Sequence, residues 1–171
     1  MTLTPLAVLV PGLMLAVTTL AAAMPWGVAA EIKPVMPLLP WIVCHFWVER
    51  REHAMPDWLV FLSGLATDVL GQGPLGYWAL VYLTGFALVS SLTHGDKRGL
   101  GVSIALFAVT ANALVILQWL TTSLYYLRLA ELWPLLMAAA MTTLVYAVLA
   151  LIVPVRSLET RRFNDRLERG A

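Results

Sequence analysis

Asp68 is the side chain in this sequence whose surroundings most suggest a chemical role. It lies near the end of a strongly apolar segment, in the stretch GLATDVLGQGPLG (64–76), and a turn rich in glycine and proline follows at once. Gly71 and Gly73 can adopt positive φ, and Pro74 can begin a turn or a helix. The free N–H groups at the start of the next helix would then offer an anion site to the carboxylate.

Other residue patterns do not indicate catalysis or metal binding. Glu49 is the sole histidine or carboxylate at i+3 or i+4 from His45, so we expect a hydrogen-bonding histidine there and no metal site. Ser63-Gly64 resembles part of the serine motif of intramembrane proteases, but Phe61 stands where that motif has glycine. The stretch GQGPLG lacks the lysine of a phosphate-binding loop. The sequence therefore predicts a protein that is not an enzyme and that needs no metal or cofactor.

The composition indicates a membrane protein built from helices. Sixty per cent (60%) of the 171 residues are hydrophobic and only 12% are charged, whereas soluble domains are about half apolar and about a quarter charged. The single cysteine, Cys44, lies in an apolar run, so neither a disulfide framework nor a cysteine-rich metal site is expected. We predict an all-α, polytopic integral membrane protein.

Hydropathy predicts about six transmembrane helices, because a helix needs about 20 mostly apolar residues to cross roughly 30 Å of hydrocarbon. The predicted spans lie near Pro5–Met24, Pro34–Val48, Pro56–Leu70, Gly76–Leu92, Leu100–Leu120 and Leu132–Val153. The second and third are short, so flanking residues extend them, neighbouring helices bury them, or they cross incompletely. Ala21-Ala22-Ala23 resembles a signal-peptide cleavage site, but no basic residues precede the apolar stretch, which favours a retained anchor.

Lysine and arginine predict the orientation of these spans. With the N-terminus inside, nine of them fall in cytoplasmic segments, namely Arg50, Arg51, Lys97, Arg98, Arg156, Arg161, Arg162, Arg166 and Arg169. Only Lys33 and Arg128 fall in outer loops. The positive-inside rule therefore places both termini in the cytoplasm. We expect a transmembrane bundle over residues 1–153 and a short basic cytoplasmic tail over 154–171, which either lies along anionic lipid or a partner or is simply solvated.

In this topology Asp68 lies near the outer, C-terminal end of the third helix, where the helix dipole disfavours negative charge. The local interpretation is that the carboxylate bonds N–H groups across its own hairpin and ties the third helix to the fourth. The alternatives are a contact with Asn112 or Gln118 in the fifth helix, a contact with a ligand or partner protein, or exposure to water. Gly64 precedes Asp68 by one turn on the same face and allows close backbone approach.

The block PDWLVFLSGLATDVLGQGPLGYWAL (56–80) resembles the MreD family of rod shape-determining membrane proteins, whose third and fourth spans carry a similar hairpin. The matching positions here are Gly64, Leu65, Asp68, Gly71, Pro74, Leu75 and Gly76. The length, the helix count and the basic tail also fit that family. Gln72-Gly73 occupies a part of the turn that varies in such proteins, and the flanking spans match by hydropathy alone.

The resemblance implies a non-catalytic subunit of the bacterial cell-elongation complex in the cytoplasmic (inner) membrane. The implied partners are MreC, the glycosyltransferase RodA with its transpeptidase partner, MreB filaments indirectly, and membrane lipids; no nucleic acid is expected.

This family is also thought to resemble, in fold, the substrate-binding subunits of energy-coupling-factor vitamin transporters. The alternative is therefore an outward-opening binder of a small molecule, with Asp68 contacting a polar ligand. A transporter subunit should hold several convergent polar groups at its outer side, whereas this sequence offers few beyond Asp68, Asn112 and Gln118. That scarcity favours the elongation complex.

Overall fold

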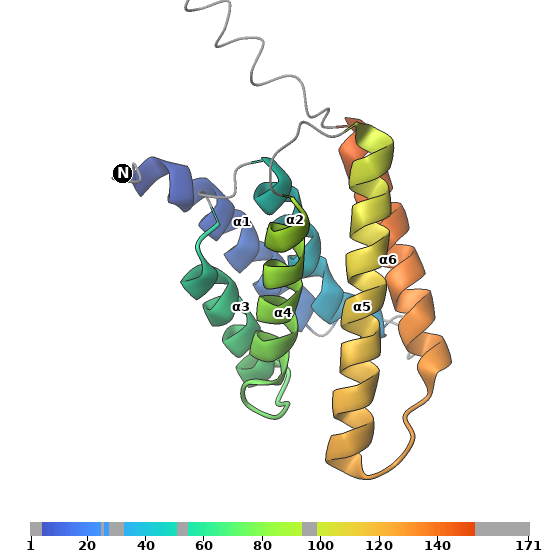
Figure 1. Ribbon diagram of the computed structural model, residues 1–171. Helices are drawn as coiled ribbons and strands as arrows, with labels where there is room; N and C mark the ends of the chain where they lie inside the picture. Colours follow the sequence, from blue (N-terminus) through green and yellow to red (C-terminus); the bar gives the residue numbers. More distant parts are fainter. Residues whose placement is uncertain (1–4, 25, 28–32, 51–54, 94–98, 153–171) are drawn as a thin grey trace, which may run out of the picture.

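The computed structural model describes residues 5–24, 26–27, 33–50, 55–93 and 99–152 (Figure 1). Over these ranges the chain is all-helical and has no β-strand, as the sequence predicts. The elements in order are α1 (Pro5–Ala23), the 3₁₀ helix η1 (Lys33–Leu38), α2 (Leu39–Arg50), α3 (Asp57–Leu70), α4 (Tyr77–Leu92), α5 (Leu100–Tyr126) and α6 (Leu132–Ile152). The predicted tail over 154–171 and the loops that hold Arg51, Lys97 and Arg98 lie outside the described residues.

Four of the predicted spans agree closely with α1, α3, α4 and α6, and two differ. The segment predicted as the second span begins as η1, which contains Pro37, and α2 begins only at Leu39. Proline has no N–H to donate within a helix, so it favours this short, tighter helix over a regular α-helical turn. α5 continues to Tyr126, beyond the predicted end at Leu120. The prediction followed hydropathy, which falls at Thr121, Thr122 and Ser123, but a helix does not have to end where its apolar stretch ends.

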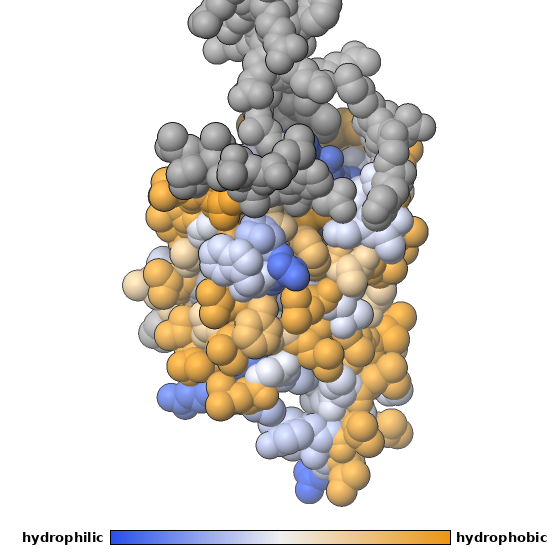
Figure 2. Space-filling view, turned by 60° about the vertical axis from the view of Figure 1, so that its left-hand side comes forward, coloured by the Kyte–Doolittle hydropathy of each residue, from blue (hydrophilic) through white to orange (hydrophobic). Residues whose placement is uncertain are grey.

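α5 and α6 are the two described helices that are both long and apolar enough to cross a membrane. They have 27 and 21 residues, which corresponds to lengths of about 40 and 31 Å. Val8–Ala23 and Tyr77–Leu92 are apolar but shorter. The face of the molecule drawn in Figure 2 is mostly hydrophobic, with hydrophilic side chains at its lower edge and in a small group higher up.

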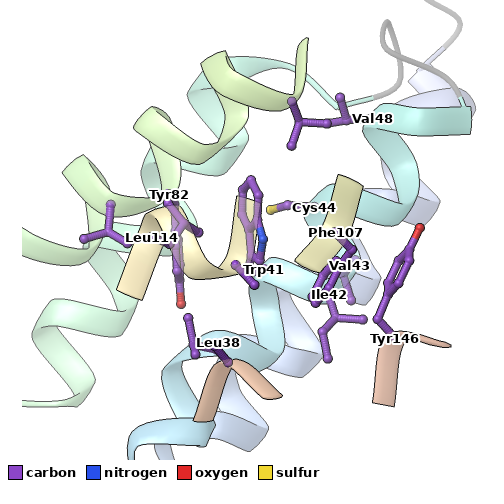
Figure 3. Close-up of a cluster of buried hydrophobic side chains, with 14 of the residues drawn as sticks. Leu38, Trp41, Ile42, Val43, Cys44, Val48, Tyr82, Phe107, Leu114 and Tyr146 are labelled. Carbon is purple, nitrogen blue, oxygen red and sulfur yellow. The ribbon is translucent and has the colours of Figure 1, made fainter. Parts of the chain in front are cut away.

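α2 forms the centre of the bundle, although it has only 12 residues. It packs against α1 and α4 and, together with η1, against α6. Trp41 is fully buried and lies with Tyr82 of α4 and Leu114 of α5 in the cluster shown in Figure 3. A Cβ on Gly85 of α4 would come within 2.6 Å of the Trp41 ring, so the glycine makes room for the indole.

Trp41→Ala should therefore destabilise the fold strongly. Removal of a fully buried Trp leaves a cavity, and such a change typically costs about 3–5 kcal/mol. The matched control is Trp58→Ala, because the Trp58 side chain is 55% exposed and its loss should cost much less. Thermal unfolding of the purified protein in one detergent measures both changes. Equal losses of stability in the two variants would contradict the central position of α2.

Candidate functional site

The carboxylate of Asp68 is fully buried between α3 and α4 and accepts two backbone hydrogen bonds. Oδ2 accepts from the N–H of Gly76 and Oδ1 from the N–H of Trp78, each at 2.9 Å. Gly76 is the N-cap of α4 and has no side chain that could cap the helix. Asp68 supplies the missing cap from the preceding helix, so the predicted local tie across the hairpin is confirmed.

The turn between the two helices takes positive φ at Gln72 (53°) and at Gly76, whereas Gly71 has φ of −81°. Gly71 and Gly73 therefore do not supply the positive φ expected of them. The N–H of Gly71 bonds the carbonyl of Thr67, and that of Gly73 bonds the carbonyl of Asp68, at 2.9 and 3.0 Å. These bonds satisfy carbonyl groups at the end of α3. Gly76 has φ of +90°, a conformation that costs glycine little and most other residues more. That conformation directs the first N–H groups of α4 back toward the Asp68 carboxylate.

Gly64 lets α3 and α4 approach closely, as its position one turn before Asp68 predicts. A Cβ at this residue would lie 2.4 Å from Cα of Ala79 and 2.8 Å from the carbonyl carbon of Trp78. Both are backbone atoms, which cannot move as a flexible side chain can. The glycine therefore sets the interhelical distance that brings the Asp68 carboxylate within reach of the N–H groups of α4.

The remaining motif residues differ in exposure. Gly71 and Gly73 are exposed, and Pro74 is half-buried. Leu75 is 73% exposed. The turn that holds it joins the lower ends of α3 and α4 in Figure 1, at one end of the bundle. Within the stretch 64–76 Leu75 is the most exposed large apolar side chain, and Val69 and Leu70 at the end of α3 are 59% and 45% exposed.

Asn112 and Gln118, the two residues of α5 considered as partners of Asp68, do not bond its carboxylate. Asn112 is exposed, and its Nδ2 donates to the carbonyl of Ala108 on its own helix at 2.8 Å, so the prediction that it contacts the bundle is wrong. α5 buries one side against its neighbours, and Asn112 lies on the opposite, exposed side. Gln118 is buried, and its backbone carbonyl accepts a 3.3 Å hydrogen bond from the hydroxyl of Tyr77. Gln118 thus lies beside the start of α4, without a bond to the carboxylate.

A second buried carboxylate, Glu49, was not recognised in the sequence. Its Oε2 accepts hydrogen bonds from Ser103 of α5 at 2.5 Å and from Tyr146 of α6 at 2.6 Å, so it joins the end of α2 to both helices. In sequence Glu49 precedes basic residues and reads as part of a charged loop. The available signal was its spacing from His45, one helical turn earlier on the same face.

His45 is fully buried, but it is not hydrogen-bonded as predicted. Its two ring nitrogens have no hydrogen-bond partner among the described residues, and Nδ1 lies 3.7 Å from Oε2 of Glu49. The imidazole is enclosed by aromatic rings, with centroids 5.0 Å from Phe107 and 5.1 Å from Tyr146. Over the described ranges no three His, Cys, Asp or Glu side chains lie close enough together to hold a metal ion.

No protein-family model, curated protein or solved structure matches this chain. The candidate site therefore has to be interpreted from its own geometry. Both oxygens of the Asp68 carboxylate are engaged by backbone N–H groups, so its role in this structure is to position α4 and the turn, and the surface open to other molecules is the turn itself.

Asp68→Asn should loosen the hairpin. An amide can accept one of the two backbone hydrogen bonds but directs an NH₂ group at the other N–H, and a hydrogen bond to a charged group contributes about 1.5–3 kcal/mol. The free energy of unfolding in detergent should fall by about that amount. The control is Asp57→Asn in the exposed first turn of α3, which should cost less than about 1 kcal/mol. A loss at Asp68 no larger than at Asp57 would contradict the capping role.

Gly64→Ala should also destabilise the chain, because the new methyl group would meet backbone atoms of α4. Overpacking of this kind costs about 1–3 kcal/mol. Gly73→Ala is the matched control, since a Cβ at Gly73 would meet no atom within 4 Å. Thermal unfolding of both variants beside the wild type tests the prediction, which fails if Gly64→Ala is as stable as Gly73→Ala.

Proposed function

We propose that this chain is a multi-pass protein of the bacterial cytoplasmic membrane, similar to the MreD family, that acts without catalysis in the cell-elongation complex. The observation that carries the proposal is the hairpin held by Asp68. Its residues at 64–76 resemble the hairpin motif of that family, and the contacts of Gly64, Asp68 and Gly76 give a physical reason for a small residue, a carboxylate and a glycine at these positions. The proposal assigns the hairpin a role in regulating cell shape and lateral peptidoglycan synthesis through helix packing.

The proposed topology has six spans with both termini in the cytoplasm. α5 and α6 cross by themselves. α2 and α3 have 12 and 14 residues, or about 18 and 21 Å, which is less than the roughly 30 Å hydrocarbon layer. Contacts with neighbouring helices, together with η1 before α2, therefore have to position them. This topology places the turn after α3 on the outer side and the end of α2 on the inner side.

The mechanism we propose is that the turn 71–76 forms a rigid outer surface to which a partner binds. Asp68 and Gly64 fix the turn relative to α3 and α4, so a partner meets a preformed surface and loses less conformational entropy on binding. Leu75 is the apolar contact that this surface offers. The partner is the membrane helix or juxtamembrane segment of MreC, and RodA with its transpeptidase partner joins the same complex.

The transporter alternative requires polar groups that converge on a ligand. Both oxygens of Asp68 accept bonds within its own hairpin, Asn112 lies on the exposed side of α5, and Oε1 of Gln118 is buried without a partner among the described residues. None of the three converges with another. This arrangement favours a structural subunit over a binder of small polar molecules.

Depletion of the protein in its own host tests the proposal. Cells should become round and wide, and wild-type protein should restore rods. Leu75→Lys should be produced, inserted and as stable as wild type but should fail to restore rod shape, because the substitution alters only an exposed contact. Leu129→Lys is the control, since Leu129 is 85% exposed in the turn between α5 and α6; it should restore rods.

Two results would contradict the proposal. Unchanged cell shape after depletion, accompanied by a requirement for a nutrient, would instead support the transporter alternative. Full restoration of rod shape by Leu75→Lys would show that the turn is not part of the partner interface, even if the chain itself acts in elongation.

A further inference from the structure

The exposed side of α5 carries one polar residue in an otherwise apolar stripe. The stripe consists of Val102, Ala105, Val109, Asn112, Ile116 and Leu120, all of them exposed. Their separations of three and four residues place them on one face of the helix. α5 itself packs against α4 and α6 on its other sides (Figure 1). The stripe is thus an unpartnered face of a helix that is long and apolar enough to cross a membrane.

Asn112 lies near the middle of α5, where a lipid-facing amide is costly. One N–H of the amide donates to the carbonyl of Ala108. A side-chain amide has a second N–H and a carbonyl oxygen, and neither has a protein partner among the described residues. Lipid tails provide no hydrogen bonds, so polar groups at this depth are stabilised by bonds to another helix. The amide therefore points to a helix that covers the stripe.

We propose that a second copy of this chain covers the stripe, with the α5 helices of the two copies in contact and their Asn112 amides bonded to each other. An amide is complementary to itself, since each one donates and accepts. A twofold axis along the membrane normal places the two Asn112 residues opposite each other at the same depth, so their amides can bond without a shift of either helix.

The residues around Asn112 suit such a contact. Ala105 is small, so the two helices can approach closely about two turns away from the amide. From Val102 to Ile116 the stripe follows the alternating three- and four-residue spacing of paired helices, and an asparagine at the centre of such a contact can set its register. This surface lies on α5, away from the α3–α4 turn, so the inference rests on the proposed membrane-spanning topology but not on the role in cell elongation.

Disulfide cross-linking in native membranes tests the contact. Ile116→Cys and, as control, Leu144→Cys on the exposed side of α6 are placed in a Cys44→Ala chain; both positions are exposed apolar sites. Oxidation should give covalent dimers from position 116 and far fewer from position 144. Adding Asn112→Leu to Ile116→Cys should lower the dimer yield, whereas Asn112→Gln, which keeps an amide, should largely preserve it.

The affinity of the two copies can be measured in lipid vesicles by energy transfer between labelled chains. Asn112→Leu should weaken dimerisation about three- to twentyfold, the range that interhelical hydrogen bonds give in bilayers. The proposal is overturned if positions 116 and 144 cross-link equally, if Asn112→Leu leaves dimerisation unchanged while the helix content stays that of wild type, or if position 116 cross-links only to a different protein.

Discussion

The buried carboxylate of Asp68 is the interaction on which the hairpin of α3 and α4 depends. At the end of α3 it would meet the unfavourable end of that helix dipole without compensation. The first N–H groups of α4 provide the compensation, and they in turn lack any other cap. A side chain at the end of α3 thus caps the start of α4, and the turn between them is held with Leu75 exposed.

A comparable arrangement exists at the end of α2. Glu49 accepts bonds from Ser103 and Tyr146, so α2 is joined to the long helices α5 and α6 by a carboxylate, as α3 is joined to α4. α2 is too short to cross a membrane unaided, and its place is set instead by these bonds and by the enclosure of Trp41. The short helices of the bundle are therefore positioned by specific side-chain contacts more than by their length.

The sequence was sufficient for those features that are set by local chemistry. Helix positions followed from hydropathy, and the tie between Asp68 and its own hairpin followed from the adjacent glycines and the dipole of α3. The sequence alone did not predict which side of a helix is buried. Asn112, a candidate contact inside the bundle, is exposed, while Glu49, noted in the sequence only for its spacing from His45, is bonded between α2, α5 and α6. Tertiary packing decides which face of each helix is buried, because these helices are apolar on all sides and their sequences show little one-sided pattern.

The central claim is that a partner binds the turn that Asp68 holds. Photo-cross-linking in living cells from a reactive amino acid placed at position 75 tests it most directly, because it identifies which molecule contacts that turn. The account predicts a cross-link to a membrane protein of the elongation complex, MreC first, that is lost when Asp68 is replaced by Ala in a chain that still inserts. A cross-link to lipid alone, or one to the same protein that is unaffected by the loss of Asp68, would contradict it.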